Sequence, residues 1–245
     1  MRILEGEGVT KYFGGLSAVS DVDFYVNQGE VVGLIGPNGA GKTTLFNLIS
    51  AALVPKPGII KFKGRDITGM KPHAICRLGI ARTFQTVKIF ANLPVFSNVR
   101  VGSLFGVSKK TSPAETGKTT AELLEFVGLS NVSNIPAKDL TLANQKRLEV
   151  ARALATKPEL LLLDELMAGL NQTEVTQAME LLKQIRGEGI TVIMIEHVMK
   201  AIMNVCDRII VLHHGQKIAE GTPQEIATSK TVIKVYLGEQ TNAGN

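Results

Sequence analysis

A glycine-rich stretch near the N-terminus carries the clearest chemical signal in this sequence. It reads Gly36-Pro37-Asn38-Gly39-Ala40-Gly41-Lys42-Thr43. Glycines let successive backbone N–H groups turn toward one anion, and the N-terminus of a following helix adds the positive end of its dipole. Lys42 is expected to reach the β- and γ-phosphates of a nucleotide, and the Thr43 hydroxyl to bind Mg²⁺. The stretch therefore predicts binding of a nucleoside triphosphate with magnesium rather than an ordinary glycine-rich turn.

Two acidic residues follow a continuous apolar run further along the chain. Residues 160–163 are all leucine and are followed by Asp164 and Glu165, as expected of a buried parallel strand that presents carboxylates at its C-terminal end. Asp164 is the natural carboxylate for Mg²⁺, and Glu165 is placed to act as a base or to orient the attacking water. Gln85 and His197 also end predicted strands and could meet the acids at one sheet edge. Taken singly, each of these residues is equally consistent with a capping or hydrogen-bonded surface residue.

Alternating strand and helix patterns supply the elements that must position these residues. Residues 2–8 and 20–28 read as strands of an antiparallel sheet, and residues 30–35 as the strand that enters the glycine-rich stretch. Apolar residues at helical spacing predict an amphipathic helix over 173–187. The predicted class is an α/β fold with a mostly parallel sheet and an N-terminal antiparallel β subdomain. Further strands are predicted at 59–62, 79–85, 159–163, 190–195, 208–212 and 216–220.

The β-rich pattern disappears between about residues 86 and 157. Glycine, serine, threonine and lysine around 106–120 indicate a flexible connection within this region. We therefore expect a helical insertion subdomain, about 86–157, within the nucleotide-binding core. Residues 1–245 as a whole are expected to form one domain.

Composition limits the other possibilities. The 245 residues are 44% hydrophobic, which is enough to bury a substantial core. The chain has no uncharged apolar run of about 18 residues and no signal-peptide pattern at its start, so we expect a cytoplasmic protein. Cys76 and Cys206 lie outside any C-x-x-C pattern, which indicates reduced thiols. A net charge of +5 without a basic run indicates a mildly basic surface and no nucleic-acid partner.

In their order and spacing, these motifs resemble those of the ATP-binding-cassette (ABC) ATPases, and the resemblance covers nearly the whole chain. The glycine-rich stretch resembles the Walker A loop, and residues 160–164 resemble the Walker B strand. The resemblance implies a P-loop NTPase core, with ATP and Mg²⁺ as cofactors. The nucleotide-binding residues that it implies here are Gly36, Pro37, Asn38, Gly39, Ala40, Gly41, Lys42, Thr43 and Thr44.

The same resemblance gives roles to single residues. Gln85 resembles the Q-loop glutamine, Glu165 the catalytic glutamate and His197 the switch histidine. It also implies that Phe13 stacks on the adenine, whereas the position of Phe13 at a strand end favours, by itself, a core residue. The metal ligands that the resemblance implies are Thr43, Gln85 and Asp164.

One motif departs from the family pattern. Residues 140–144, Leu-Thr-Leu-Ala-Asn, align with the family's Leu-Ser-Gly-Gly-Gln signature, which implies contact of Thr141, Leu142 and Ala143 with the nucleotide of a second subunit. Thr141 keeps a hydroxyl group. Ala143 replaces the second glycine, and its Cβ is expected to hinder the approach of the backbone to the partner's γ-phosphate. The departure therefore concerns the catalytic rate more than ATP binding.

Four further stretches resemble the ATPase subunits of branched-chain amino-acid importers, namely residues 79–85, 167–171, 220–223 and 232–239. The resemblance implies a separate membrane permease, a second ABC ATPase subunit that is identical or homologous, and indirectly a solute-binding protein. The chain is then expected on the inner face of the cell membrane as a peripheral subunit whose ATP-driven dimerisation powers transport. Cassettes that move urea, short amides or lipopolysaccharide remain alternatives.

Two other classes of protein share the phosphate-binding loop. A soluble mechanical ATPase acting on ribosomes or DNA would show tandem cassettes, a long coiled coil or a basic arm, and this sequence shows none of them. A small-molecule phosphotransferase would leave the signature-like helix and His197 unexplained. The sequence therefore favours the ATPase subunit of a transporter.

An apolar cluster with few charges follows Gln85 directly. In the family, this region faces the permease, and an exposed apolar groove would receive an amphipathic helix. We therefore predict that the cluster forms the contact with the membrane subunit. The alternative is packing inside the helical subdomain. Its members are Val87, Ile89, Phe90, Leu93, Val95 and Phe96.

Overall fold

The computed structural model describes residues 1–107 and 112–242. The chain forms two compact units: the first unit comprises Met1–Lys71 with Thr191–Asn245, and the second unit comprises Pro72–Ile190. Among the described residues, no helix is both long and apolar enough to cross a membrane.

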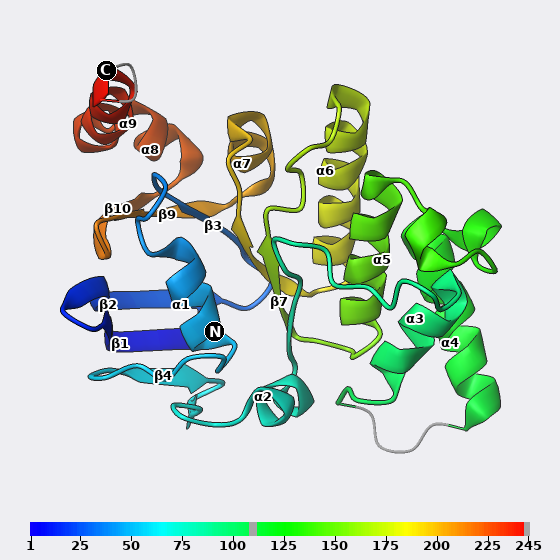
Figure 1. The fold of residues 1–245 in the computed structure, drawn as a ribbon. Coiled ribbons are helices and arrows are strands. Elements are labelled where there is room, and N and C mark those ends of the chain that lie inside the picture. Colours follow the sequence, from blue (N-terminus) through cyan, green and yellow to red (C-terminus); the bar gives the residue numbers. More distant parts are fainter. Residues whose placement is uncertain (108–111, 243–245) are drawn as a thin grey trace. The chain divides into compact units, whose positions relative to one another are not determined.

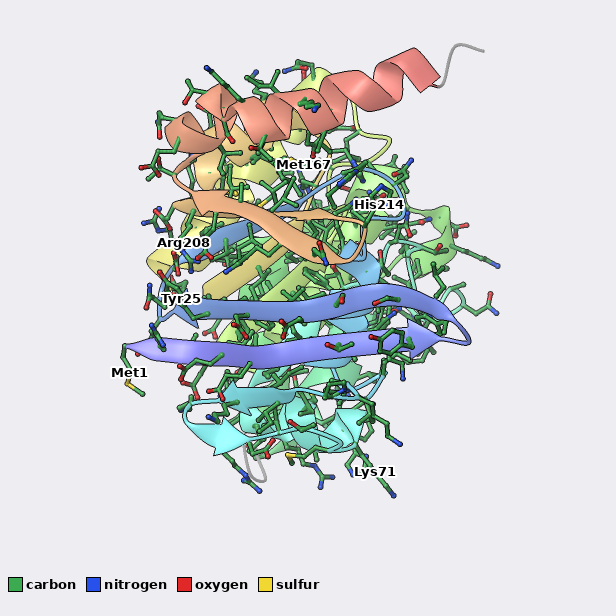
Figure 2. All side chains as sticks on the ribbon, turned by 90° about the vertical axis from the view of Figure 1, so that its left-hand side faces the viewer. Met1, Tyr25, Lys71, Met167, Arg208 and His214 are labelled. Carbon is green, nitrogen blue, oxygen red and sulfur yellow. The ribbon has the colours of Figure 1, made fainter. Side chains whose placement is uncertain are left out.

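An antiparallel sheet opens the first unit. Strands β1 (Arg2–Phe13) and β2 (Leu16–Asn27) lie side by side (Figure 2), and β4 (Ile59–Phe62) pairs with the other edge of β1. The short strand β5 (Arg65–Asp66) completes the order β2-β1-β4-β5. The predicted antiparallel sheet is confirmed, but both long strands extend further toward their turn than predicted. The chain reverses only at Gly14, whose φ of 59° an L side chain rarely adopts.

A mostly parallel set of strands follows in the same unit. The buried strand β3 (Val31–Ile35) lies between β8 (Thr191–Ile195) and β9 (Arg208–His213), parallel to both. β10 (Gln216–Gly221) returns antiparallel to β9, which confirms the predicted hairpin. The helices are α1 (Lys42–Ile49), α7 (Met199–Val205), α8 (Pro223–Thr228) and α9 (Lys230–Asn242). Helices α8 and α9 both contact β10 (Figure 1).

A half-buried ion-pair network ties these strands together. Arg208 donates two hydrogen bonds to the Glu30 carboxylate, at 2.7 and 2.9 Å, and it also pairs with Glu220. Its guanidinium lies 4.2 Å from the centroid of the Tyr25 ring, at the end of the strands where Figure 2 labels both residues. Burial alone would raise the pKa of Glu30, but the hydrogen bonds from Arg208 and from the backbone of Asn27, together with the charge of Arg208, outweigh it and lower that pKa.

Replacing Arg208 by methionine is therefore expected to destabilise the fold by about 3 kcal/mol, because the largely buried Glu30 carboxylate loses both hydrogen bonds from Arg208. Glu220 keeps its ion pair with Lys217, at 2.7 Å. Urea unfolding at neutral pH measures this, with Arg65→Met at an exposed position of the same unit as the control. The stabilisation from Glu30 is complete above the ordinary glutamate range and is lost as the pH falls through its lowered pKa. Equal unfolding free energies for the two variants would show that the network adds nothing.

The second unit contains two parallel strands and a group of helices. β6 (Ile80–Arg82) runs parallel to β7 (Leu160–Asp164), which is buried along its whole length as the leucine run predicts. Helices α3, α4 and α5 pack on one another (Figure 1). The helices are α2 (Pro72–Leu78), α3 (Val95–Ser103), α4 (Pro113–Phe126), α5 (Leu142–Leu154) and α6 (Gln172–Gly187), with short 3₁₀ turns at Ser130–Val132 and Ala137–Asp139.

Two local predictions in the second unit are wrong. The strand predicted over 79–85 ends at Arg82, since Thr83 makes the last backbone hydrogen bond to Leu162, at 2.9 Å, and the following residues are exposed. The flexible connection predicted around 106–120 contains the start of α4. Ser112 and Glu115 form a reciprocal capping box at the helix start, which outweighs the polar composition. Residues 108–111 of that predicted connection lie outside the described residues.

Candidate nucleotide-binding and catalytic site

The glycine-rich loop joins the end of β3 to the start of α1, as the sequence predicts. At Gly36, a Cβ atom would lie 2.1 Å from the carbonyl oxygen of Leu212, and at Gly41 it would lie 2.3 Å from that of Ala18. Any side chain at either position would displace backbone, so these glycines are required sterically. These two glycines therefore let the loop pass close to neighbouring backbone as it turns from β3 into α1, the connection that a phosphate cradle uses.

Lys42 is held inside this cradle. Its side chain is buried, and its ammonium donates to the carbonyl oxygens of Gly36 and Pro37 at 2.6 and 2.8 Å. Asn38, Gly39 and Thr43 are exposed at the mouth of the loop. A fixed cation beside exposed backbone amides and a hydroxyl group is a donor set that fits a triphosphate.

The carboxylates at the end of β7 are positioned by residues at the end of β6 and just after it. Asp164 forms an ion pair with Arg82 at 2.9 Å, in which both side chains are at least nine-tenths buried. The backbone N–H of Asp164 donates to the hydroxyl oxygen of Thr83 at 3.2 Å. The side-chain amide of Gln85 donates to the Glu165 carboxylate at 3.1 Å. The structure thus brings together Gln85 and Glu165, two of the predicted catalytic residues.

The remaining predicted site residues of the first unit lie at strand ends. His197 follows β8 and is exposed, and its backbone N–H donates to the buried carboxylate of Glu196 at 3.3 Å. Phe13 ends β1 with half of its surface exposed, and the Lys11 ammonium lies 5.8 Å from its ring centroid. The ring is therefore available for stacking rather than buried in the core.

The signature segment begins helix α5. The Thr141 hydroxyl accepts a hydrogen bond from the backbone N–H of Asn144 at 3.4 Å and so caps the helix. Ala143 is buried, whereas Leu142 is 45% exposed. The Leu142 side chain approaches Gly169, where an added Cβ would lie 3.1 Å from Leu142 Cδ2. The exposed replacement at this helix end is thus Leu142, and the methyl group of Ala143 packs within the chain.

Sequence reasoning missed two residues that hold these groups. Arg82 pairs with Asp164, and Lys146 of α5 donates to the carbonyl oxygens of Glu165 and Ala168, at 2.7 Å each. In a sequence, a charged residue in a strand or a helix is normally interpreted as a solvated surface residue. Only the apolar residues next to Arg82 and Lys146 in the sequence could have indicated that these two side chains are buried.

Both cysteines are free thiols. Burial raises the pKa of Cys76 and raises that of Cys206 to about 12. The thiolate is disfavoured at both positions, in line with the predicted structural role.

Comparison with known families identifies the chain. A family model described as ABC transporter matches residues 19–168, more than half of the sequence. A second model, described as branched-chain amino acid ATP-binding cassette transporter, matches residues 216–241. The chain therefore belongs to the ABC transporter family. It is an ATP-hydrolysing, nucleotide-binding subunit that powers transport through a separate membrane permease.

Individual relatives cover almost the whole chain. The high-affinity branched-chain amino acid transport ATP-binding protein BraF of Pseudomonas aeruginosa is 41% identical over 250 residues, covering 97% of this chain and 98% of BraF. The lipopolysaccharide export system ATP-binding protein LptB of Haemophilus influenzae is 34% identical, covering 98% of this chain and 99% of LptB.

Solved structures agree with the fold. The ATP-binding cassette MJ1267 of an ABC transporter superposes with a TM-score of 0.88 at 32% identity, covering 96% of this chain and 99% of that one. A dimeric, post-hydrolysis structure of the cassette MJ0796 bound to ADP and phosphate gives a TM-score of 0.82 at 26% identity, covering 90% of this chain and 99% of that one.

Proposed function

We propose that this chain is the ATPase subunit of an importer for branched-chain or other amino acids. The observation that carries the choice of solute is the match of residues 216–241 to the branched-chain amino acid cassette model. The identity to BraF over nearly the whole chain supports the same choice. The whole chain, residues 1–245, then acts as one nucleotide-binding domain with a helical subdomain at about 86–157.

In this proposal the loop binds ATP and the strand-end residues drive its hydrolysis. Glu165 orients or deprotonates the attacking water, Gln85 holds that carboxylate in place, and His197 contributes to stabilising charge at the γ-phosphate. The hydroxyl, amide and carboxylate oxygens of the proposed Mg²⁺ ligands are oxygen donors of the kind that Mg²⁺ prefers, and the ion, when bound, would neutralise phosphate charge. These ligands are Thr43, Gln85 and Asp164.

The remaining nucleotide contacts come from three places. The loop residues Gly36 to Thr43, together with Thr44, hold the phosphates, and Phe13 stacks on the adenine. Thr141, Leu142 and Ala143 contact the nucleotide of a second ABC ATPase subunit, either a copy of this chain or a homologue. The dimeric MJ0796 structure supports such a pairing. The chain then acts as a peripheral subunit on the inner face of the cell membrane, with permease subunits and, indirectly, a solute-binding protein as partners.

A cassette for another solute is the second candidate, because LptB, a lipopolysaccharide export protein, is 34% identical over nearly the same length. The two candidates differ in the solute that ATP moves. Co-purification of the chain with its membrane subunits, followed by reconstituted uptake against amino acids, amides and lipids, separates them. ATP-dependent accumulation of an amino acid supports the proposal, and movement of lipid alone would overturn it.

The segment after Gln85 supplies the proposed contact with the permease. Phe90 and Leu93 are 47% and 40% exposed, whereas Val95 is fully buried at the start of α3 and Phe96 is half-buried. The exposed part of the predicted cluster is therefore Phe90 and Leu93, and Val95 belongs to the core. Leu93 is the cleaner probe, because the Phe90 ring also packs against the Arg152 guanidinium.

Leu93→Ser is expected to abolish stimulation of ATP hydrolysis by the permease while basal hydrolysis and thermal stability stay close to parental. An exposed leucine contributes little to the fold but much to an apolar interface. The matched control is Val95→Ser, which should destabilise the chain by about 2 kcal/mol because it buries a hydroxyl in the core. Unchanged permease stimulation in Leu93→Ser would move the contact elsewhere.

A further inference from the structure

Three charged residues on α5 are largely withdrawn from solvent. Lys146, Glu149 and Arg152 follow one another at intervals of three and so share one side of the helix. Lys146 is 7% exposed and Glu149 4%, and the Arg152 side chain is 18% exposed. Charged side chains are seldom buried unless they are paired and bonded. We call these three residues the charged face of α5.

Lys146 holds the turn that carries the proposed base. Its ammonium donates to the carbonyl oxygens of Glu165 and Ala168, at 2.7 Å each. Glu165 has a φ of 53°, a left-handed conformation that costs a non-glycine residue of the order of 1 kcal/mol or more. Because the bonded carbonyl belongs to Glu165 itself, Lys146 fixes this strained peptide and, with it, the direction of the carboxylate.

Glu149 and Arg152 hold the segment that follows Gln85. The backbone N–H of Lys88 donates to Glu149 Oε1 at 3.2 Å. The Arg152 guanidinium donates to the backbone carbonyl oxygen of Lys88. The Arg152 guanidinium also lies 5.4 Å from the centroid of the Phe90 ring. The backbone N–H and C=O of Lys88, which lies three residues after Gln85, are therefore both bonded to the charged face of α5.

The two held segments meet at the site. Gln85 donates to the Glu165 carboxylate at 3.1 Å. This hydrogen bond joins the Glu165 backbone, which Lys146 holds, to the segment whose Lys88 backbone is held by Glu149 and Arg152. A rigid element that supports both members of a hydrogen-bonded pair sets the geometry of that pair.

We propose that the charged face of α5, with Lys146 as its principal member, positions Glu165 and Gln85 for ATP hydrolysis. This inference rests on the proposed catalytic roles of Gln85 and Glu165. The three residues act through the backbone and do not touch the reacting atoms. Since the signature segment begins the same helix, a displacement of the start of α5 is passed directly to the catalytic pair.

The test compares kcat and KM for ATP in the purified full chain. Lys146→Met keeps the length of the side chain and removes the ammonium, and it is expected to lower kcat by roughly tenfold to a hundredfold, the usual effect of a small misplacement of a catalytic group. KM is expected to stay within about twofold of parental, because the phosphate cradle has its own lysine. Lys146→Arg should restore most of the rate. Lys183→Met, at an exposed ion pair on α6, is the control.

A double-mutant cycle distinguishes positioning from general loss of structure. If Lys146 acts through Glu165, Lys146→Met should have no further effect on the residual rate of Glu165→Gln, whereas independent effects would multiply. Arg152→Met should likewise add nothing in a Gln85→Ala background. If Lys146→Met does not fold, Lys146→Gln, which retains an NH₂ group that can donate, is measured in the same cycle.

Parental kcat in the Lys146 variants, or effects that multiply with that of Glu165→Gln, would overturn the positioning role. Such a result would leave the proposed role of Glu165 intact if Glu165→Gln itself is slow. A Glu165→Gln variant that turns over at the parental rate would instead overturn the proposed function, and the inference with it.

Discussion

Glu165→Gln is expected to slow ATP hydrolysis by roughly 10²–10⁴-fold, the range that general acid–base assistance supplies. The change keeps the volume of the side chain and an oxygen that can accept the hydrogen bond of Gln85, but it removes the group that takes a proton from water. ATP binding should be retained, because the phosphate cradle holds the nucleotide through other residues. The variant is therefore expected to accumulate an ATP-bound dimer.

Single-turnover hydrolysis, measured beside ATP affinity, checks this expectation. Glu180→Gln is the matched control, since Glu180 forms an exposed ion pair on α6 and should not affect turnover. A Glu165→Gln variant that hydrolyses ATP at the parental rate would place the base elsewhere. A variant that has also lost ATP binding would show that the substitution disturbs more than the chemical step.

Lys42→Ala is expected to weaken ATP binding by roughly 10²–10⁴-fold. The lysine supplies the cation for two phosphate groups, and each charged hydrogen bond is worth about 1.5–3 kcal/mol. The carbonyl oxygens of Gly36 and Pro37 already hold the Lys42 ammonium in place. The side chain therefore loses little conformational entropy when the nucleotide binds.

Calorimetric titration with ATP measures the loss, and the unfolding curve of the same sample shows whether the fold survives. Lys71→Ala, an exposed lysine of the first unit, is the control and should bind ATP as the parent does. Near-parental affinity in a folded Lys42→Ala protein would contradict the assignment of the cradle.

Much of the architecture could be predicted because strong local patterns agree with the tertiary structure. The leucine run predicts a fully buried strand, and the helical spacing of apolar residues over 173–187 predicts a helix with one buried side. Strand β7 and helix α6 form as predicted. The hairpin between β9 and β10 follows from its turn residues. Composition alone gives the wrong prediction where a helix cap determines the structure. The hydrogen-bonded pair Ser112 and Glu115 starts a helix in a stretch whose composition predicts a flexible connection.

The site was only partly predictable for a different reason. The residues that carry chemistry, such as Lys42 and Glu165, can be recognised from sequence motifs. The residues that orient them act through contacts between distant parts of the chain, which no motif marks. Lys146 reaches carbonyl groups 19 and 22 residues away, and Arg82 reaches a carboxylate 82 residues away. The exposure of Leu142 and the burial of Ala143 likewise depend on the helix start and on Gly169. No periodicity encodes such contacts.

Uptake into proteoliposomes tests whether ATP hydrolysis by this chain powers amino-acid import. The chain is reconstituted with the membrane subunits that co-purify with it, and accumulation of labelled leucine, isoleucine and valine is followed with and without ATP. Accumulation is expected to require ATP and to fall with Glu165→Gln in proportion to hydrolysis. Accumulation that is independent of ATP, or equal in the Glu165→Gln complex, would contradict it.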